Sequence, residues 1–230
     1  MHQPLVSCII PVWNGEKYVA EAIESVLGQT YAALEIVVVD DGSTDGTPAL
    51  LSSYGERIVT IRQDQSGPAV ARNVGIERST GEFIAFLDAD DLWDPRKTEL
   101  QMARFVQRPD LAICLCEVRN FWSPEIDIPQ GGAATERMDS VSGWFAQSML
   151  VKREAFRAVG AFDTSLRHRE AMDWLRRATD SGLAVDAVKE ILVHRRLHLT
   201  NRSRSRAAND HESLLRIARA ALSRRAGKGA

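Results

Sequence analysis

The apolar positions in the first half of the chain follow two alternating patterns. Short runs rich in Val, Ile and Leu end at Pro, Gly or Asp and predict buried strands. Between these runs, apolar side chains recur every three or four residues and predict helices that bury one face. The expected strands cover residues 5–12, 35–39, 57–62 and 82–87, and the expected helices cover residues 19–27, 47–54, 69–79 and 95–107.

Strands that alternate with helices predict right-handed βαβ units, and hence an α/β fold with a mostly parallel sheet and helices on both faces. In such sheets, ligands bind in the crevice beyond the carboxyl ends of the strands. Two acidic clusters fall at those ends: Asp40 and Asp41 follow the second strand, and residues 88–91 follow the fourth. We therefore expect a polar ligand site at this edge.

The second half of the chain has a less regular pattern. Residues 121–141 contain Pro and Gly with little periodicity and predict a long loop, while the rest predicts further strands and helices. The expected strands are 147–152 and 190–199, and the expected helices are 154–159, 169–180 and a basic amphipathic helix at 207–225. We expect one compact domain with a donor-binding half (1–115), an acceptor-binding half (116–200) and a basic C-terminal helix or tail (201–230).

Composition narrows the class of protein. A hydrophobic content of 44% and a charged content of 26% are typical of a soluble globular protein. The last 36 residues hold ten Arg and Lys against two acidic residues, so the net charge of −2 hides an acidic body with a basic tail. An acidic body argues against a nucleic-acid partner.

Cysteines and apolar runs bear on the compartment. Cys8, Cys114 and Cys116 fit neither a disulfide framework nor a zinc site and are expected to be buried, reduced thiols. The N-terminal apolar run lacks the features of a signal peptide, and no stretch approaches the ~18 apolar residues of a membrane span. We expect a cytoplasmic protein, with contact to the inner membrane face as an alternative.

The first motif with clear chemistry is Asp88-Ala89-Asp90-Asp91. In an extended segment, alternate side chains point the same way, so Asp88 and Asp90 can face one ligand. Two carboxylates at a strand end suit a hard divalent cation that also binds diphosphate oxygens. The alternative is a solvated acidic turn or a helix cap.

The second motif is the segment from Asp40 to Gly46. A carboxylate after a buried strand can accept the imide N–H of uracil or thymine, a donor that adenine lacks. The alternative is an Asx-turn with glycines at positive φ.

Taken together, these segments resemble family 2 glycosyltransferases. The resemblance covers residues 5–105, in the order and spacing of the family. It rests on residues 10–18 (IPVWNGEKY), 24–31 (ESVLGQTY), 40–47 (DDGSTDGT), 71–73 (ARN) and 81–91 (GEFIAFLDADD).

The resemblance implies a GT-A type fold and an enzyme that uses a nucleoside diphosphate sugar, usually a UDP-sugar, with Mn²⁺ or Mg²⁺ and inverts the anomeric centre. Carried over by position, Asp40 contacts the base, Asp88 the ribose side, and Asp90 the metal. The remaining nucleotide-pocket residues that it implies are Pro11, Val12, Asn14, Glu16, Arg72 and Ala89.

The resemblance becomes partial at the acceptor side. Family members commonly carry a Glu-Asp pair whose Asp is the general base, and here the corresponding residues are Glu170 and Ala171. Alanine cannot accept a proton, so Glu170 or Asp173 serves as base, or the chain is impaired. A further alternative is that both acids only pair with arginines on a solvated helix.

Other candidate contacts lie in the second half. His198 resembles a late metal ligand of these enzymes, although a lone histidine is also often structural. Arg196 is a candidate for contact with the diphosphate, and both Arg196 and Asp91 are candidates for sugar or acceptor contacts. Trp144 is a candidate for stacking on a sugar, the alternative being a core position.

We therefore predict an inverting, metal-dependent glycosyltransferase. The alternatives are a catalytically impaired nucleotide-sugar-binding protein and, less favoured, a sugar nucleotidyltransferase, which would need a Gly-rich basic loop after the first strand. The acceptor is left open among a glycan, a lipid-linked sugar, a peptide and a small molecule. The C-terminal helix could pack on the sheet, on a second subunit in a homodimer, or on anionic lipid.

Overall fold

The computed structural model describes residues 3–125, 140–141, 145–166, 168–198, 201 and 217 of the 230-residue chain. Its strands are β1 (Val6–Val12), β2 (Leu34–Asp40), β3 (Val59–Arg62), β4 (Phe83–Phe86), β5 (Leu92–Trp93), β6 (Leu111–Trp122), β7 (Ser140–Val141), β8 (Leu150–Lys152) and β9 (Ala184–Leu197). Its α-helices are α1 (Val19–Leu27), α2 (Thr47–Ser52), α3 (Pro68–Arg78), α4 (Lys97–Gln107), α6 (Arg153–Val159) and α7 (Glu170–Asp180), with 3-10 turns η1 (Gly55–Arg57) and η2 (Ala146–Ser148).

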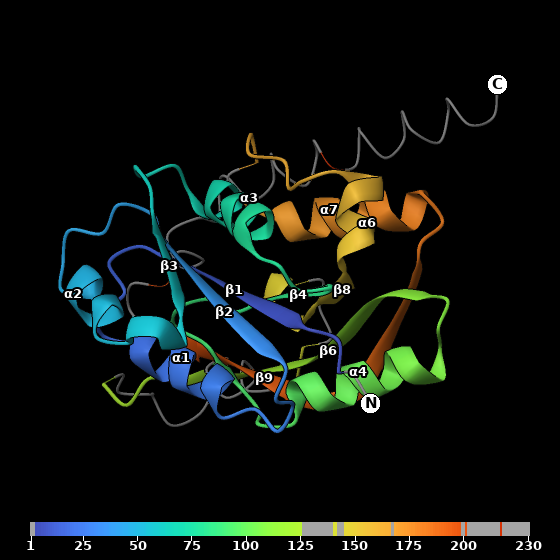
Figure 1. The fold of residues 1–230 in the computed structure, drawn as a ribbon, viewed down its shortest axis with the longest axis horizontal. Coiled ribbons are helices and arrows are strands. Elements are labelled where there is room, and N and C mark those ends of the chain that lie inside the picture. Colours follow the sequence, from blue (N-terminus) through green and yellow to red (C-terminus); the bar gives the residue numbers. More distant parts are fainter. Residues whose placement is uncertain are drawn as a thin grey trace, which may run out of the picture.

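The described strands form one sheet in the order β3-β2-β1-β4-β8-β6-β9-β5, with β7 paired to β6 outside this path. Helices α3, α6 and α7 cover one face, and α1 and α4 cover the other (Figure 1). Strands β3, β2, β1 and β4 are parallel, as the alternation of strands and helices predicts. The predicted α/β fold with helices on both faces is confirmed.

The apolar run of β1 supplies both faces of the sheet. Cys8 and Ile10 pack in the apolar cluster under α1 and α4, and Ile9 packs in the cluster under α6 and α7. All three side chains are fully buried. A strand with both faces covered by helices is continuously apolar, which is why this element is evident from the sequence.

The second half of the sheet was predicted less well. β6 runs through Phe121 and Trp122, and β7 lies at 140–141, so the prediction of loop for those residues was wrong. β9 begins at Ala184 rather than near 190, and the expected strand at 147–152 is confirmed only from Leu150. From Leu115 onward β6 alternates between buried and more exposed side chains. Such a half-covered strand carries polar residues and therefore gives no continuous apolar run.

Part of the expected organisation lies outside the described residues. The basic helix at 207–225, its contact with a membrane or a second subunit, and the tail 201–230 belong there, apart from the isolated positions 201 and 217. Within the described part of the chain, none of the helices combines the length and apolar character needed to cross a membrane.

The first residue of α4, Lys97, is a fully buried lysine. The Lys97 ammonium is 4.1 Å from the centre of the Trp93 ring and donates to Gln101 Oε1 at 2.7 Å. Gln101 Nε2 in turn donates to the carbonyl oxygens of Cys114 and Ser148. The neighbouring thiols, including Cys114, are unpaired and buried, as predicted. Burial lowers the pKa of Lys97, because a charged amine loses hydration there.

The lowered pKa of Lys97 predicts a pH-dependent stability. The unfolded chain holds this proton up to about pH 10.4, and the folded protein loses it at lower pH. Between these two pKa values the unfolded state binds more protons, so this group makes the free energy of unfolding rise with pH. Relative to Lys97→Met, the free energy of unfolding of the wild-type protein should therefore increase by about 1.4 kcal/mol for each pH unit between these two pKa values.

Urea unfolding at a series of pH values measures this difference. Lys189→Met, at an exposed position of β9, is the matched control and should follow the wild-type curve. Parallel stability curves for the wild type and Lys97→Met would show that the buried amine holds its proton equally in both states.

Candidate active site

The expected ligand edge is formed by the carboxyl ends of three neighbouring parallel strands. Val12 pairs with Asp40 across β1 and β2, and Ile9 pairs with Phe86 across β1 and β4. The Asp88–Asp91 segment, which follows β4, therefore lies at the same edge as Asp40. The nearby candidates Pro11, Val12 and Ala89 are at least partly buried: the first two belong to β1, and Ala89 packs against the core.

Two loops at this edge are tied to each other by the side chains of Asn14 and Glu16. Asn14 Oδ1 accepts a hydrogen bond from the Thr44 backbone N–H at 2.8 Å, and Glu16 Oε2 accepts one from the Gly46 N–H at 2.6 Å. In return, the Asn14 N–H donates to Ser43 Oγ at 2.9 Å. Asn14 also has a left-handed backbone, with φ of 49°. Both candidates thus shape the loop after Asp40.

The adjacent aspartates Asp40 and Asp41 have different surroundings. Asp40 is buried at the end of β2, where Oδ1 accepts from the Ser43 N–H at 2.9 Å and Oδ2 pairs with Arg62 at 2.7 Å. Asp41 accepts from Gln63 and from the backbone N–H groups of residues 66 and 67. Asp41 therefore holds the turn that starts α3, while Asp40 holds the start of the loop that follows β2.

Arg72 links the Asp88–Asp91 segment to the second half of the chain. Its guanidinium, buried in α3, contacts Asp88 through one terminal nitrogen and Glu170 through the other. The Asp88 side chain remains 34% exposed. The Arg72 pKa is raised: burial opposes the charged form, but the carboxylates of Asp88 and Glu170 outweigh it. One guanidinium therefore bridges a carboxylate that follows β4 and a carboxylate at the start of α7.

Asp90 meets the end of β9. Its Oδ2 lies 2.8 Å from His198 Nε2 and 3.2 Å from Asn201 Nδ2, and its side chain is 32% exposed. The structure thus brings together Asp90 and His198, the two predicted metal ligands. Among the described residues, no group of three or more His, Cys, Asp or Glu is arranged to hold a metal ion.

Asp91 is buried and is contacted by two protein donors. Oδ1 accepts from the backbone N–H of Arg196 at 2.8 Å, and Oδ2 accepts from Gln147 Nε2 at 3.1 Å. Burial, and secondly repulsion from Asp90 and Asp88, raise the pKa of Asp91. The Arg196 side chain is also buried, and its Nε donates to the Asp90 carbonyl at 3.0 Å. In this structure, Asp91 and Arg196 connect β9 to the motif.

The candidate bases lie in the first turn of α7. Glu170 faces Arg72, whereas Asp173 pairs with Arg177, four residues later, at 2.8 Å. Arg177 also donates to the carbonyl oxygens of Val159 and Ala161, so this second pair braces the loop after α6. Both acids are buried, and thus neither lies on a solvated helix face. Ala171 packs in the apolar cluster of α6 and α7.

Two aromatic side chains at this edge, Trp13 and Tyr18, are not among the site residues predicted from the sequence. Trp13 follows β1 and is 51% exposed, which is unusual for so large an apolar group. Tyr18 precedes α1 and its ring packs against His198. The position of Trp13 next to Asn14 was a usable signal, because a large apolar residue directly after a buried strand lies at the ligand edge. Trp144 lies outside the described residues.

The fold resembles those of solved glycosyltransferases. S. aureus TarS 1-349 in complex with UDP-GlcNAc superimposes with a TM-score of 0.73 and 19% sequence identity, over 96% of this chain and 66% of that one. The mannosyltransferase PcManGT from Pyrobaculum calidifontis, in complex with GDP-Man and Mn²⁺, gives a TM-score of 0.74 and 20% identity, over 97% of this chain and 65% of that one. This is the GT-A fold that the sequence predicts.

Sequence comparison agrees with the fold. An uncharacterized glycosyltransferase of Rickettsia typhi is 33% identical over 209 residues, which cover 86% of this chain and 65% of the relative. The chain therefore spans slightly less than two thirds of the length of that relative. Residues 7–143, more than half of the chain, match the model of the family named glycosyl transferase family 2. The chain belongs to glycosyl transferase family 2.

Proposed function

We propose that the chain transfers a glycosyl group from a nucleoside diphosphate sugar, a UDP-sugar in the favoured case, to an acceptor hydroxyl with inversion and with a divalent metal. The observation that carries the proposal is the pair of partly exposed carboxylates, Asp88 and Asp90, at the carboxyl edge of the sheet. Asp91, which follows Asp90 in the sequence, is buried and accepts hydrogen bonds from two protein donors. The division into a donor half and an acceptor half belongs to the same proposal.

The residues at Asp90 suit a divalent metal. A carboxylate oxygen and an imidazole nitrogen 2.8 Å apart are ligands that Mn²⁺ accepts. With so few protein ligands, a metal would keep positions for the donor diphosphate, which is how Mg²⁺ and similar ions bind nucleotides. When bound, the ion would offset the negative charge that develops on the leaving diphosphate. Binding of GDP-Man and Mn²⁺ by PcManGT supports this assignment.

The base-recognition site is proposed to lie at Asp40 and Trp13. Each oxygen of a carboxylate can accept more than one hydrogen bond. The contacts of Asp40 with Ser43 and Arg62 therefore leave capacity for a hydrogen bond from a nucleobase. The uracil imide N–H is a suitable donor, and the exposed Trp13 indole offers a stacking surface. Binding of UDP-GlcNAc by TarS supports a uracil nucleotide.

Glu170 is the proposed catalytic base. It shares the Arg72 guanidinium with Asp88 and is therefore linked directly to the donor edge. Asp173, the other candidate, is engaged by Arg177 on the side of the loop after α6.

Metal-dependent nucleotide binding tests the donor site. Calorimetric titration of UDP should show binding in the presence of Mn²⁺ that weakens at least about tenfold in Asp90→Asn, because a metal contact is lost. ADP should bind about 10–100-fold more weakly than UDP, since adenine lacks the imide donor for Asp40. GDP belongs in the same series, because guanine also presents an N–H to a carboxylate.

Asp110→Asn is the matched control for that titration. It makes the same chemical change just before β6, at the opposite edge of the sheet, and should bind Mn²⁺ and UDP as the wild type does. Equal binding of UDP with Mn²⁺ and with EDTA would contradict the metal-dependent donor site, as would wild-type affinity in Asp90→Asn. Tighter binding of GDP than of UDP would identify guanine, in place of uracil, as the nucleobase of the sugar donor.

The role of Glu170 predicts a separation of binding from turnover. Glu170→Gln should lower the rate of sugar transfer, or of donor hydrolysis in water, by about 10²–10⁴, while UDP binding is retained. Ala171→Asp should raise the rate by less than about tenfold, because the base is already present. Initial rates at saturating donor, with calorimetric UDP affinity for each variant, check both expectations. A large gain in Ala171→Asp with no loss in Glu170→Gln would instead identify an impaired, nucleotide-sugar-binding chain.

A further inference from the structure

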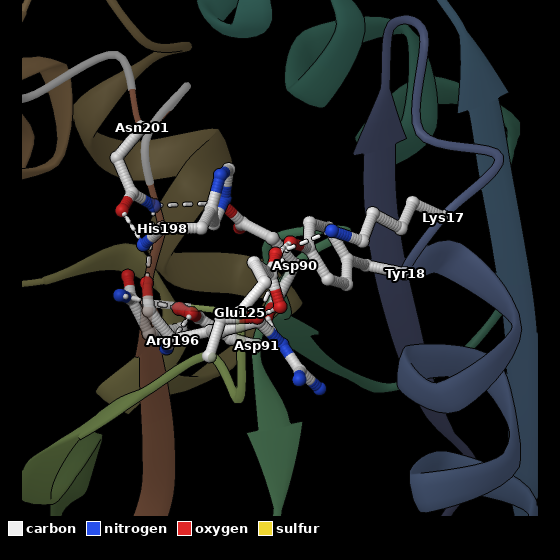
Figure 2. Close-up of polar contacts among 10 residues, drawn as sticks. Lys17, Tyr18, Asp90, Asp91, Glu125, Arg196, His198 and Asn201 are labelled. Carbon is white, nitrogen blue, oxygen red and sulfur yellow. Dashed lines mark hydrogen bonds and ion pairs between the residues drawn. The ribbon is translucent and has the colours of Figure 1, made fainter. Parts of the chain in front are cut away.

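Tyr18, in the first half of the chain, contacts residues of the second half next to the proposed metal site. It is the residue before α1 and is 9% exposed. Its ring centre lies 4.8 Å from that of His198 and 4.8 Å from the guanidinium carbon of Arg196. Figure 2 shows Lys17 and Tyr18 reaching from the first half toward Arg196, His198 and Asn201, with Asp90 and Asp91 between them.

The two groups that Tyr18 contacts both hold Asp90. His198 Nε2 lies 2.8 Å from Asp90 Oδ2, and Arg196 Nε donates to the Asp90 carbonyl at 3.0 Å. Arg196 is further enclosed by the Phe121 ring at 4.7 Å and by an ion pair with Glu21 of α1 at 2.7 Å. The ring of Tyr18 is thus one contact away from the carboxylate and from the backbone of Asp90.

The other end of Tyr18 is anchored separately. Its hydroxyl donates to Glu125 at 2.5 Å and lies 3.3 Å from Ser123 Oγ, just beyond the end of β6. Lys17 binds the same Glu125 carboxylate and lies 5.0 Å from the Tyr18 ring centre. Hydrogen bonds from Lys17, Ser123 and Tyr18 lower the pKa of Glu125, so this anchor is charged over the working pH range. The ring therefore has a fixed orientation against His198.

We propose that Tyr18 is a positioning residue whose ring fixes His198 and Arg196 against Asp90 and so preorganises Asp90 for the metal and the donor diphosphate. The role rests on the proposed function. The ring and the hydroxyl have different tasks: the ring orients the groups that hold Asp90, and the hydroxyl binds the segment that follows β6. Removal of a group that contacts and orients a metal ligand, without touching the metal itself, typically lowers metal affinity by about 10–100-fold.

Three substitutions at Tyr18 separate these tasks. Tyr18→Leu removes the ring and should weaken Mn²⁺-dependent UDP binding at least about tenfold, with little change in UDP binding in EDTA. Tyr18→Phe keeps the ring and should stay close to the wild-type affinity. Tyr18→Met keeps much of the side-chain volume without a ring, should behave as Tyr18→Leu does, and replaces it if the leucine variant does not fold.

Tyr31 supplies the matched controls. It is also buried and donates through its hydroxyl, to the Pro4 carbonyl at 2.7 Å, but it lies near the amino end of β1, at the opposite edge of the sheet. Tyr31→Leu and Tyr31→Phe remove the same atoms there. They should lower the melting temperature without changing Mn²⁺-dependent UDP affinity.

Calorimetric titration of each full-length variant with UDP, in Mn²⁺ and in EDTA, decides the matter, with thermal unfolding as the test of folding. A folded Tyr18→Leu or Tyr18→Met variant with wild-type affinity would overturn the role of Tyr18. So would Tyr18→Phe as weak as Tyr18→Leu, which assigns the effect to the hydroxyl, or an equal loss in Tyr31→Leu, which assigns it to stability. No metal-dependent UDP binding by the wild type would refute the donor site itself and, with it, the task of Tyr18.

Discussion

The arrangement of this site depends on one buried carboxylate. Asp91 accepts hydrogen bonds from the backbone of Arg196 in β9 and from the side chain of Gln147, next to β8, and so joins three segments that are far apart in the sequence. Burial of a carboxyl group is unfavourable unless donors compensate it, and here the two donors also define where the end of β9 lies. His198 and Arg196 reach Asp90 because of this connection.

Two arginines at the site, Arg72 and Arg196, connect segments that are far apart in the sequence. Arg72 contacts Asp88, which follows β4, and Glu170 of α7, and Arg196 connects Glu21 of α1 to the Asp90 backbone. Buried ion pairs of this kind contribute little net stability, because desolvation offsets much of their attraction. We infer that their main effect is to hold the carboxylates at defined positions before a ligand arrives.

The sequence alone predicted the elements of the first half of the chain well, for identifiable reasons. β1 and β2 are apolar on both faces, so their residues form continuous runs, and the acidic motifs directly follow such runs. β9 and the second half of β6 were missed because they are only partly covered and mix polar with apolar residues. Contacts such as Arg72 with Glu170, which lie 98 residues apart, leave no local pattern at all.

What the sequence determined by itself was the sheet, the edge at which its parallel strands end, and the acidic residues placed there, because these follow from local periodicity and motif spacing. It did not indicate how deeply Asp40 or Asp41, and Asp90 or Asp91, would be buried, because each pair consists of chemically identical neighbours. Only the tertiary structure decided that Asp90 stays partly exposed beside His198 while Asp91 is buried between β9 and Gln147. The physical reason is that the solvation and partners of a carboxylate depend on segments that meet only in the folded chain.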